Sequence, residues 1–236
     1  MQTDIIEKEH SVVYTIKDAP VEYHETLLHL FFSRSHGQYE KEYLKESLMF
    51  VHNMDTIKRN FDVCLEPMIL NFMEKQCFDF DAVMDKMLSF FEHQHIRYWL
   101  TGSAACKLRG IDLIPHDIDV MTYKSELHKI EQGWNAHIIE PFHHITDWVV
   151  KGFGVVWIDA RIDSAFEPED QSDVDGNLDF GCFAQQHLEP IVWNDHTILV
   201  PPVDLHLLSN TRRKRVDRVQ KITEYLQQTS DFQRTE

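Results

Sequence analysis

The pattern of apolar and polar positions is clearest in the middle of the chain. Apolar residues recur every three or four positions over residues 79–93, which predicts an amphipathic helix that ends near His93. Residues 96–100 then alternate with the two-residue period of a strand. Gly102-Ser103 interrupts that strand, and the next residues predict a short helix closed by Gly110. The pattern therefore predicts a strand, a tight turn and a helix in succession.

Two further strands are predicted downstream. Apolar Ile118 and Val120 alternate with Asp117 and Asp119, so both carboxylates lie on one face of a strand. Residues 154–164 predict a third, continuous strand whose polar face carries Asp159 and then Asp163. A polar loop over residues 167–177, a short strand at 197–200 and a long C-terminal helix after Pro201-Pro202 complete the prediction.

The N-terminal part has a less regular pattern. Residues 1–78 contain apolar clusters near Leu28, Leu48 and Leu70, separated by polar connectors, and this predicts an N-terminal helical region. The second region would span residues 79–236. The sequence therefore predicts an α+β protein: a mixed sheet flanked by helices, with an N-terminal helical extension.

Composition limits the partners and the compartment. The formal net charge is −16, from 39 acidic against 23 basic side chains, so the overall field repels long nucleic acids unless positive charge gathers locally. No apolar stretch is long enough for a membrane span, and the first residues lack the basic start and apolar core of a signal peptide. The four cysteines show no CxxC spacing. We therefore expect a cytoplasmic protein with no membrane partner.

The paired aspartates suggest metal chemistry. Two carboxylates one residue apart on a strand, joined by a third from a neighbouring strand, can form a set of oxygen ligands of the kind that Mg²⁺ takes. Two such ions can stabilise both the attacking and the leaving oxygen of a phosphoryl displacement. A glycine at a strand-to-helix turn, as at Gly102-Ser103, lets the backbone approach a triphosphate, and the serine hydroxyl can then bind its oxygens.

The segment YWLTGSAACKLRG followed by PHDIDVMT resembles the signature of the DNA polymerase beta-like nucleotidyltransferase superfamily, nearest to its small aminoglycoside and lincosamide nucleotidyltransferases. The resemblance covers roughly residues 80 to 225. It implies that Asp117 and Asp119 bind the metal ions and that Gly102 and Ser103 hold the nucleotide phosphates. It also implies a third acid on a later strand, for which Asp159 is the first choice and Asp163 the reserve.

On this interpretation the protein transfers a nucleoside monophosphate from a nucleoside triphosphate to an acceptor hydroxyl and releases pyrophosphate. The expected cofactor is Mg²⁺ and the expected co-substrate is ATP. Asp117, Asp119 and Asp159 would carry catalysis, with a small molecule favoured over nucleic acid as the acceptor. One alternative is a catalytically silent nucleotide-binding or protein-interaction module of the same fold, with a protein partner bound through the N-terminal helices. Another is a nucleotidyltransferase acting on a protein or an RNA end.

For several other residues the sequence allows either contact with a ligand or a purely structural or solvated role. The basic run from Arg212 to Arg215 could face a triphosphate or form a solvated helix face. Lys107 and Arg109 could likewise reach phosphate or point outward. His116 could touch a ligand, although a histidine in such a loop is more often solvated. Tryptophans 99, 148 and 157 are interpreted as packing residues rather than a base-stacking platform.

Overall fold

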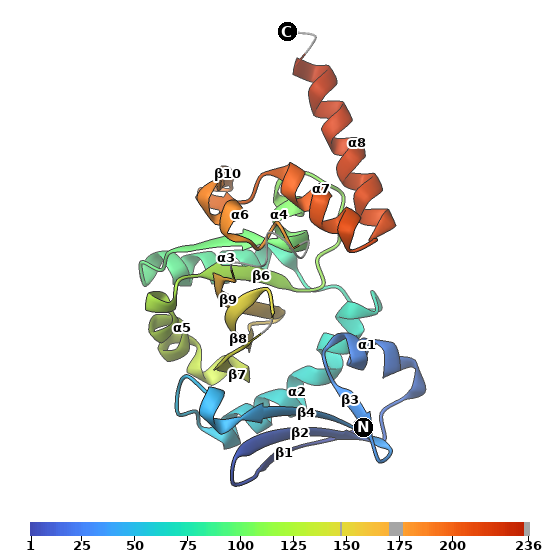
Figure 1. Ribbon diagram of the computed structural model, residues 1–236, viewed down its shortest axis with the longest axis vertical. Coiled ribbons are helices and arrows are strands. Elements are labelled where there is room, and N and C mark those ends of the chain that lie inside the picture. The colour runs from blue at the N-terminus through green and yellow to red at the C-terminus, as the bar shows by residue number, and fades with distance from the viewer. Residues whose placement is uncertain (147, 170–176, 234–236) are drawn as a thin grey trace.

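The computed structural model describes residues 1–146, 148–169 and 177–233. Its centre is a five-stranded mixed sheet in the order β5-β6-β9-β8-β7 (Figure 1). Only the β6 and β9 pair is parallel; the other neighbouring strands are antiparallel. The strands span Tyr98–Thr101 (β5), Ile118–Thr122 (β6), Ile138–His144 (β7), Val150–Trp157 (β8) and Arg161–Pro168 (β9). The expected α+β architecture with a mixed sheet is therefore confirmed.

Helices flank this sheet and follow it. They span Phe80–His93 (α3), Gly102–Leu108 (α4), Leu127–Trp134 (α5), Cys182–Gln186 (α6), Val203–Arg212 (α7) and Val216–Gln233 (α8). A separate hairpin pairs β10, Glu189–Trp193, with β11, His196–Val200. Short 3-10 turns cover Val21–Tyr23, Lys45–Ser47, Lys124–Glu126 and Asn135–His137. Within the described ranges, no helix is both long enough and apolar enough to cross a bilayer.

Helix α3 forms where the periodicity predicts it. The Asp79 side chain caps its first turn by accepting a hydrogen bond from the backbone N–H of Ala82 at 3.1 Å. Its apolar stripe is buried in the main core. Strand β5 and helix α4 follow, and Gly110 takes the left-handed conformation with φ +88°. The strand, turn and helix expected around Gly102 are therefore confirmed.

The N-terminal part corrects the expected helical region. Residues 2–44 form an antiparallel sheet in the order β1-β2-β4-β3, seen at the bottom of Figure 1. Its strands span Gln2–Glu7 (β1), Ser11–Lys17 (β2), Ser33–Ser35 (β3) and Gln38–Leu44 (β4), and its helices span His24–His29 (α1) and Met54–Phe72 (α2). Strand β2 is rich in β-branched residues, and its apolar positions alternate to face α2, where the rings of Tyr14 and Phe61 lie 4.9 Å apart. A wholly helical extension is therefore wrong, although α2 is helical.

The N-terminal sheet and α2 are fastened to the edge strand β7. The Tyr14 hydroxyl donates to the carbonyl oxygen of Ile139 at 3.0 Å, within the buried core. Asn60 of α2 donates to the carbonyl oxygen of Ile138 at 2.9 Å. The Met49 backbone N–H donates to the carbonyl oxygen of Phe142 at 2.9 Å. These bonds satisfy backbone groups that an edge strand would otherwise leave open.

The segment 154–164 is not one strand. It folds as β8 and β9, joined by a tight turn in which the Ile158 N–H donates to the Ala160 carbonyl oxygen at 3.1 Å. Asp159 lies in this turn with φ +73°, a left-handed conformation that aspartate tolerates better than most residues. The expected C-terminal helix is likewise two helices, α7 and α8, with Lys214 at φ +56° between them. Residues 170–176 of the expected polar loop lie outside the described residues.

Candidate active site

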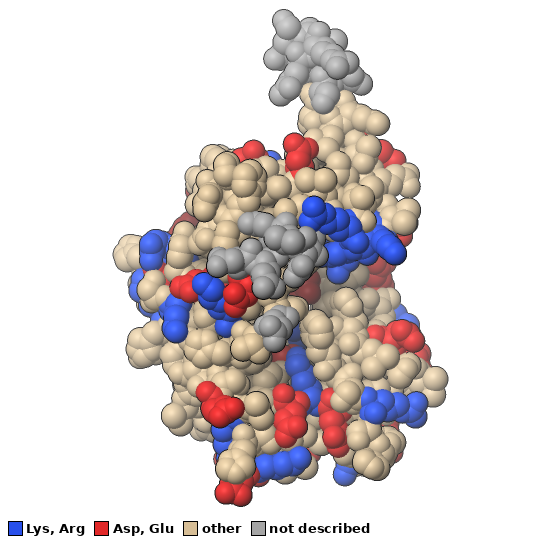
Figure 2. All heavy atoms as spheres, viewed as in Figure 1, with Lys and Arg blue, Asp and Glu red and all other residues tan. Residues whose placement is uncertain are grey.

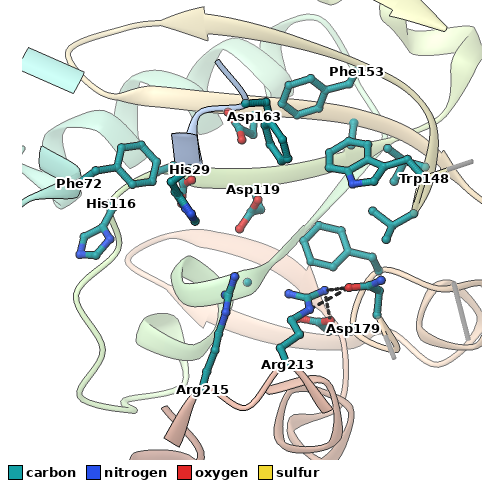
Figure 3. A pocket seen from close by; sticks show the side chains of 18 of the residues that line it. His29, Phe72, His116, Asp119, Trp148, Phe153, Asp163, Asp179, Arg213 and Arg215 are labelled. Carbon is teal, nitrogen blue, oxygen red and sulfur yellow. Dashed lines mark hydrogen bonds and ion pairs between the residues drawn. The ribbon is translucent and has the colours of Figure 1, made fainter. Parts of the chain in front are cut away.

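Three aspartates converge at one end of the central sheet. Asp119 of β6 and Asp163 of β9 are direct partners in the parallel register, and Asp117 immediately precedes β6. One ligand atom from each of the three carboxylates lies within 4.8 Å of the others. Figure 3 shows the Asp119 and Asp163 side chains directed into the same cavity. The structure therefore brings together a set of carboxylate oxygens suited to a hard cation.

Asp159, the expected third carboxylate, lies elsewhere. It belongs to the exposed β8–β9 turn, forms an ion pair with Lys86 of α3, and lines a different hollow beside Trp134 and Trp157. The reserve residue, Asp163, takes the third place in the cluster. Because a turn separates the two aspartates, they do not share the strand face that a continuous strand would give them. The preference for Asp159 is therefore corrected to Asp163.

The aspartate cluster carries unfavourable like charges. Burial raises the pKa of Asp119 well above its ordinary range, and the neighbouring Asp117 and Asp163 raise it further. Burial also raises the pKa of Asp163, with Arg161 opposing the shift and Asp117 adding to it. Holding all three carboxylates in the charged form therefore calls for positive charge at the cluster.

Arg161 supplies part of this positive charge and fixes the position of Asp163. Both residues belong to β9, and their side chains are on the same face because they are two positions apart. The Arg161 Nε lies 2.5 Å from Asp163 Oδ1 in an ion pair, and its Nη2 donates to Oδ2 at 3.4 Å. The Arg161 side chain is 2% exposed and that of Asp163 is 16% exposed, so solvent screens this pair poorly.

Arg161 is held in turn by residues from β7 and from the N-terminal sheet. Its Nη1 donates to Glu140 Oε1 at 3.1 Å. The other oxygen of Glu140 accepts hydrogen bonds from Lys41 Nζ and from the Tyr43 hydroxyl, each at 2.6 Å. Although burial opposes ionisation, the positive charges of Lys41 and Arg161 hold the pKa of Glu140 at about 2. We call Lys41, Glu140, Arg161 and Asp163 the buried charge chain.

Gly102 lines the cavity, and its missing side chain has a specific consequence. A Cβ atom at this position would lie 2.0 Å from Asp119 Oδ2, and the residue has φ +63°. Glycine is therefore required both by the backbone conformation and by the place of the Asp119 carboxylate. Ser103 follows as a buried residue of α4 and is not among those that line the cavity. Phosphate binding by these two residues stays a prediction.

The cavity beside the carboxylates has a volume of about 910 Å³. Its floor is the sheet end that carries Asp117, Asp119 and Asp163. Helix α1, with Phe31 just after it, forms part of one wall, and the region where α7 meets α8 forms part of another. The N-terminal extension therefore contributes directly to the candidate site, which no local sequence motif indicates.

Positive charge gathers at the C-terminal wall. Arg213, Arg215 and Arg218 line the cavity there, and Figure 2 shows basic side chains grouped where α7 and α8 meet. Burial lowers the pKa of Arg215, and the nearby Arg218 and Arg213 lower it further, so these cations repel one another. The ligand-facing interpretation of the basic run is therefore compatible with the structure for Arg213 and Arg215, and an anion would relieve their repulsion.

Asp179 is a cavity residue that sequence reasoning missed. It follows the expected polar loop, is 1% exposed, and contacts His206 Nδ1 at 3.3 Å and Arg213 Nη2 at 3.5 Å. Burial opposes its ionisation, but His206 and Arg213 bring its pKa below the ordinary range. Thr101, at the end of β5, donates to the Asp179 carbonyl oxygen at 2.8 Å. No spacing in the sequence indicates these contacts, which join segments far apart in the chain.

Of the other residues with two interpretations, some line the cavity and some do not. His116 lines the cavity and lies 3.1 Å from Glu74. Neither Lys107 nor Arg109 lines the cavity. Lys107 lies over the Phe80 ring, and Arg109 donates a hydrogen bond to Glu189. Trp148 packs against Phe153, as its interpretation as a packing residue expects, and it also lines the cavity.

Comparisons with known proteins return structures but no sequence relatives. No protein-family model matches the chain, and no curated protein matches its sequence. A proposed nucleotidyltransferase, TM1012, from Thermotoga maritima is similar over 62% of this chain and 92% of its own, at 15% identity and a TM-score of 0.45. ANT(2'')-Ia in complex with adenylyl-2''-tobramycin matches over 61% and 88%, at 11% identity and a TM-score of 0.39. An antigenic nucleotidyltransferase-like protein from Paracoccidioides brasiliensis matches over 62% and 77%, at 8% identity and a TM-score of 0.37.

Proposed function

We propose that this protein is a metal-dependent nucleotidyltransferase that transfers a nucleoside monophosphate, with ATP as the expected donor, to the hydroxyl of a small acceptor. The observation that carries the proposal is the convergence of Asp117, Asp119 and Asp163 at the floor of a large cavity. The sequence resemblance around Gly102 and the Asp-x-Asp strand motivates the choice of reaction.

The residues present fit a site for divalent cations such as Mg²⁺. Asp117, Asp119 and Asp163 offer carboxylate oxygens, which hard cations bind, at distances that allow a shared ion. The raised pKa of Asp119, caused by burial and by its acidic neighbours, is the effect that a bound cation would reverse. When bound, divalent ions would neutralise triphosphate oxygens and stabilise the attacking and leaving oxygens.

The chain's own groups account for the rest of the reaction. The acceptor oxygen forms a bond to the α-phosphorus, the bond from that phosphorus to the bridging oxygen breaks, and pyrophosphate leaves. Asp163, fixed by Arg161, accepts the hydroxyl proton as a general base. Arg213 and Arg215 face the cavity and would balance the charge of the departing pyrophosphate. Gly102 leaves room for the Asp119 carboxylate.

Calorimetry with ATP, GTP, CTP and UTP tests nucleotide binding in the presence and absence of Mg²⁺. We expect magnesium-dependent binding of at least one nucleotide. Gly102→Val should abolish it, because the added side chain would collide with the Asp119 carboxylate. Unchanged affinity in a folded Gly102→Val protein would contradict the role given to this turn.

Pyrophosphate release with a panel of hydroxyl-bearing acceptors tests catalysis. Asp119→Asn should lower turnover by about 100-fold or more, because it removes a negative charge that holds the cation. Its melting temperature without magnesium should be unchanged or higher, because the variant relieves repulsion among the three carboxylates. The matched control is Asp112→Asn, which changes a carboxylate that is 95% exposed and lies outside the cavity. Nucleotide binding without turnover of any small-molecule, protein or RNA acceptor would favour the silent module instead.

A further inference from the structure

Three aromatic side chains form a continuous wall on one side of the cavity. Phe153 of β8 contacts Trp148 edge to face, with ring centroids 5.4 Å apart at 89°. Trp148 contacts Phe31 in the same manner, at 6.0 Å and 82°. All three residues line the cavity, and Figure 3 shows Trp148 and Phe153 together at its edge. We call Phe31, Trp148 and Phe153 the aromatic wall.

Phe31 occupies a position where its side chain is costly for folding. It is 61% exposed and has φ +65°, at the end of α1. Its N–H donates to the Leu28 carbonyl oxygen and the next N–H donates to that of Leu27, the pattern of a helix end closed by a left-handed residue. Glycine is the usual residue at such a position, as at Gly110 after α4. The Phe31 ring contacts Trp148, lies 5.7 Å from Lys41 Nζ, and presents an aromatic surface to the cavity.

The wall lies beside Asp163 rather than beside the arginines. Phe153 pairs with Ala165, two positions beyond Asp163 on the same face of β9, so Phe153 is the diagonal cross-strand neighbour of Asp163. Figure 3 shows Arg213 and Arg215 on the opposite side of Asp119 from Phe153. The triphosphate charge belongs with the arginines, so the aromatic wall adjoins the place of the acceptor hydroxyl.

Most of the described acidic side chains at the cavity already have a partner or a proposed role. Asp163 is paired with Arg161, and Asp179 contacts both His206 and Arg213. Asp117 and Asp119 are assigned to the cation in the proposed reaction. Among the described residues that line the cavity, Glu25 is then the one carboxylate left for a positively charged group. A flat apolar ring matches the aromatic wall.

We propose that the aromatic wall is the acceptor subsite and that it takes a hydroxyl compound carrying a flat apolar or aromatic ring. This inference rests on the proposed function, since it places the acceptor of that reaction. The ring stacks on the Trp148 and Phe31 side of the cavity, and its hydroxyl points toward Asp163, which accepts the proton as the oxygen bonds to the α-phosphorus. The N-terminal extension then has a definite role, because Phe31 gives it part of the acceptor site.

Binding of two matched probes tests the subsite. Phenyl β-D-glucoside and methyl β-D-glucoside have the same sugar hydroxyls and differ in the aromatic ring. Each is titrated into the protein saturated with Mg²⁺ and a non-hydrolysable ATP analogue, with calorimetry as the readout. We expect the phenyl compound to bind about tenfold or more tightly than the methyl compound, because it buries an apolar ring. Equal affinities, or preferential binding of a polycationic aminocyclitol probe, would overturn the proposal.

Variants of the wall separate recognition from folding. Phe31→Gly removes the ring and suits the left-handed backbone, so we expect an unchanged or higher melting temperature together with about tenfold weaker binding of the phenyl probe. Trp148→Leu should weaken the probe similarly. The matched control is His95→Gly: His95 ends α3 with the same hydrogen-bond pattern, at φ +51°, and does not line the cavity. It should leave probe binding unchanged.

Nucleotide affinity distinguishes an acceptor subsite from a nucleobase subsite at the aromatic wall. Affinity for the ATP analogue should be the same in Phe31→Gly, Trp148→Leu and the wild-type protein. A loss of nucleotide affinity with no change for the phenyl probe would assign the aromatic wall to the nucleobase and overturn the acceptor assignment. Failure of the wild-type protein to bind any nucleoside triphosphate with magnesium would instead refute the proposed function itself.

Discussion

Two carboxylates on the β8–β9 hairpin are each paired with a cation, yet their surroundings differ completely. Asp159 at the turn meets Lys86 across the surface, with side chains 69% and 58% exposed. Asp163 further along β9 meets Arg161, with side chains 16% and 2% exposed. The first pair is surrounded by water, which screens its charges. The second is surrounded by protein, so its geometry is fixed and each missing partner is costly.

The difference arises from the side chains that hold each cation in place. Lys86 lies on the outer side of α3 and its ammonium group is held by one flexible side chain. Arg161 is fixed by Glu140, which is fixed by Lys41 and Tyr43 of the N-terminal sheet. A carboxylate at the end of this buried charge chain keeps one position, which metal binding and proton transfer require. The same pairing of charges therefore gives a surface contact in one place and a carboxylate with a fixed position at the proposed active site in the other.

The largest expected difference between these carboxylates is in turnover. Asp163→Asn should lower pyrophosphate release by about 1,000-fold, because it removes a carboxylate that is both the proposed metal ligand and the proposed general base. Asp159→Asn should stay within about twofold of the wild-type rate, since an exposed ion pair contributes little. Steady-state kinetics on both variants, with folding checked by circular dichroism, measure the effect. Comparable losses in the two variants would contradict the assignment of Asp163.

A smaller contrast is expected in stability. Glu140→Gln leaves Lys41 without its buried counter-charge and leaves Arg161 paired with Asp163 alone, and it should lower the free energy of unfolding by about 3 kcal/mol. Lys86→Met breaks the exposed pair and should cost less than about 1 kcal/mol. Urea unfolding of each variant gives both values. Similar small losses would show that the buried charge chain does not hold the N-terminal sheet to β9.

The pH dependence of stability should isolate Glu140 further. Its pKa is about 2 in the folded protein against an ordinary 4.5, because Lys41 and Arg161 outweigh the opposing effect of burial. A depressed folded pKa stabilises the protein fully above pH 4.5, and this contribution is lost as the pH falls from about 4.5 to about 2. The stability gap between wild type and Glu140→Gln should therefore narrow over that range in urea titrations. A gap that stays constant down to pH 2 would contradict the ionised state of Glu140.

The sequence predicted the parts of the site that local patterns determine. The α3 stripe, the strand before Gly102 and the shared face of Asp117 and Asp119 each follow from periodicity over a few residues. The third carboxylate could not be predicted in this way, because its identity depends on where the chain turns. A continuous strand would put Asp159 and Asp163 on one face; the left-handed turn at Asp159 separates them.

The N-terminal sheet and the buried charge chain depend on distant parts of the chain. The apolar clusters near Leu28 and Leu70 do lie in helices, α1 and α2, but extending the helical prediction over residues 1–78 missed the strands between them and before them. The pairing of β2 with β4 requires contacts that no local period reveals. Lys41 and Glu140 likewise read as two unrelated surface charges in the sequence. The fold buries both side chains and pairs them. Charged residues are rarely fully buried without a partner, but the sequence does not show which residues will be buried.

The attachment of Tyr14 to Ile139 also constrains how the molecule assembles. The two hydrogen-bonding residues are separated by 125 positions, so the N-terminal sheet is synthesised long before the strand that completes its core. Until β7 emerges, the apolar face of β2 lacks part of its packing surface and Lys41 has no buried counter-charge. A nascent chain would therefore expose this sheet from the completion of β4 at Leu44 until β7 is complete at His144. That interval is when association with a chaperone, or with another unfinished chain, is most favourable.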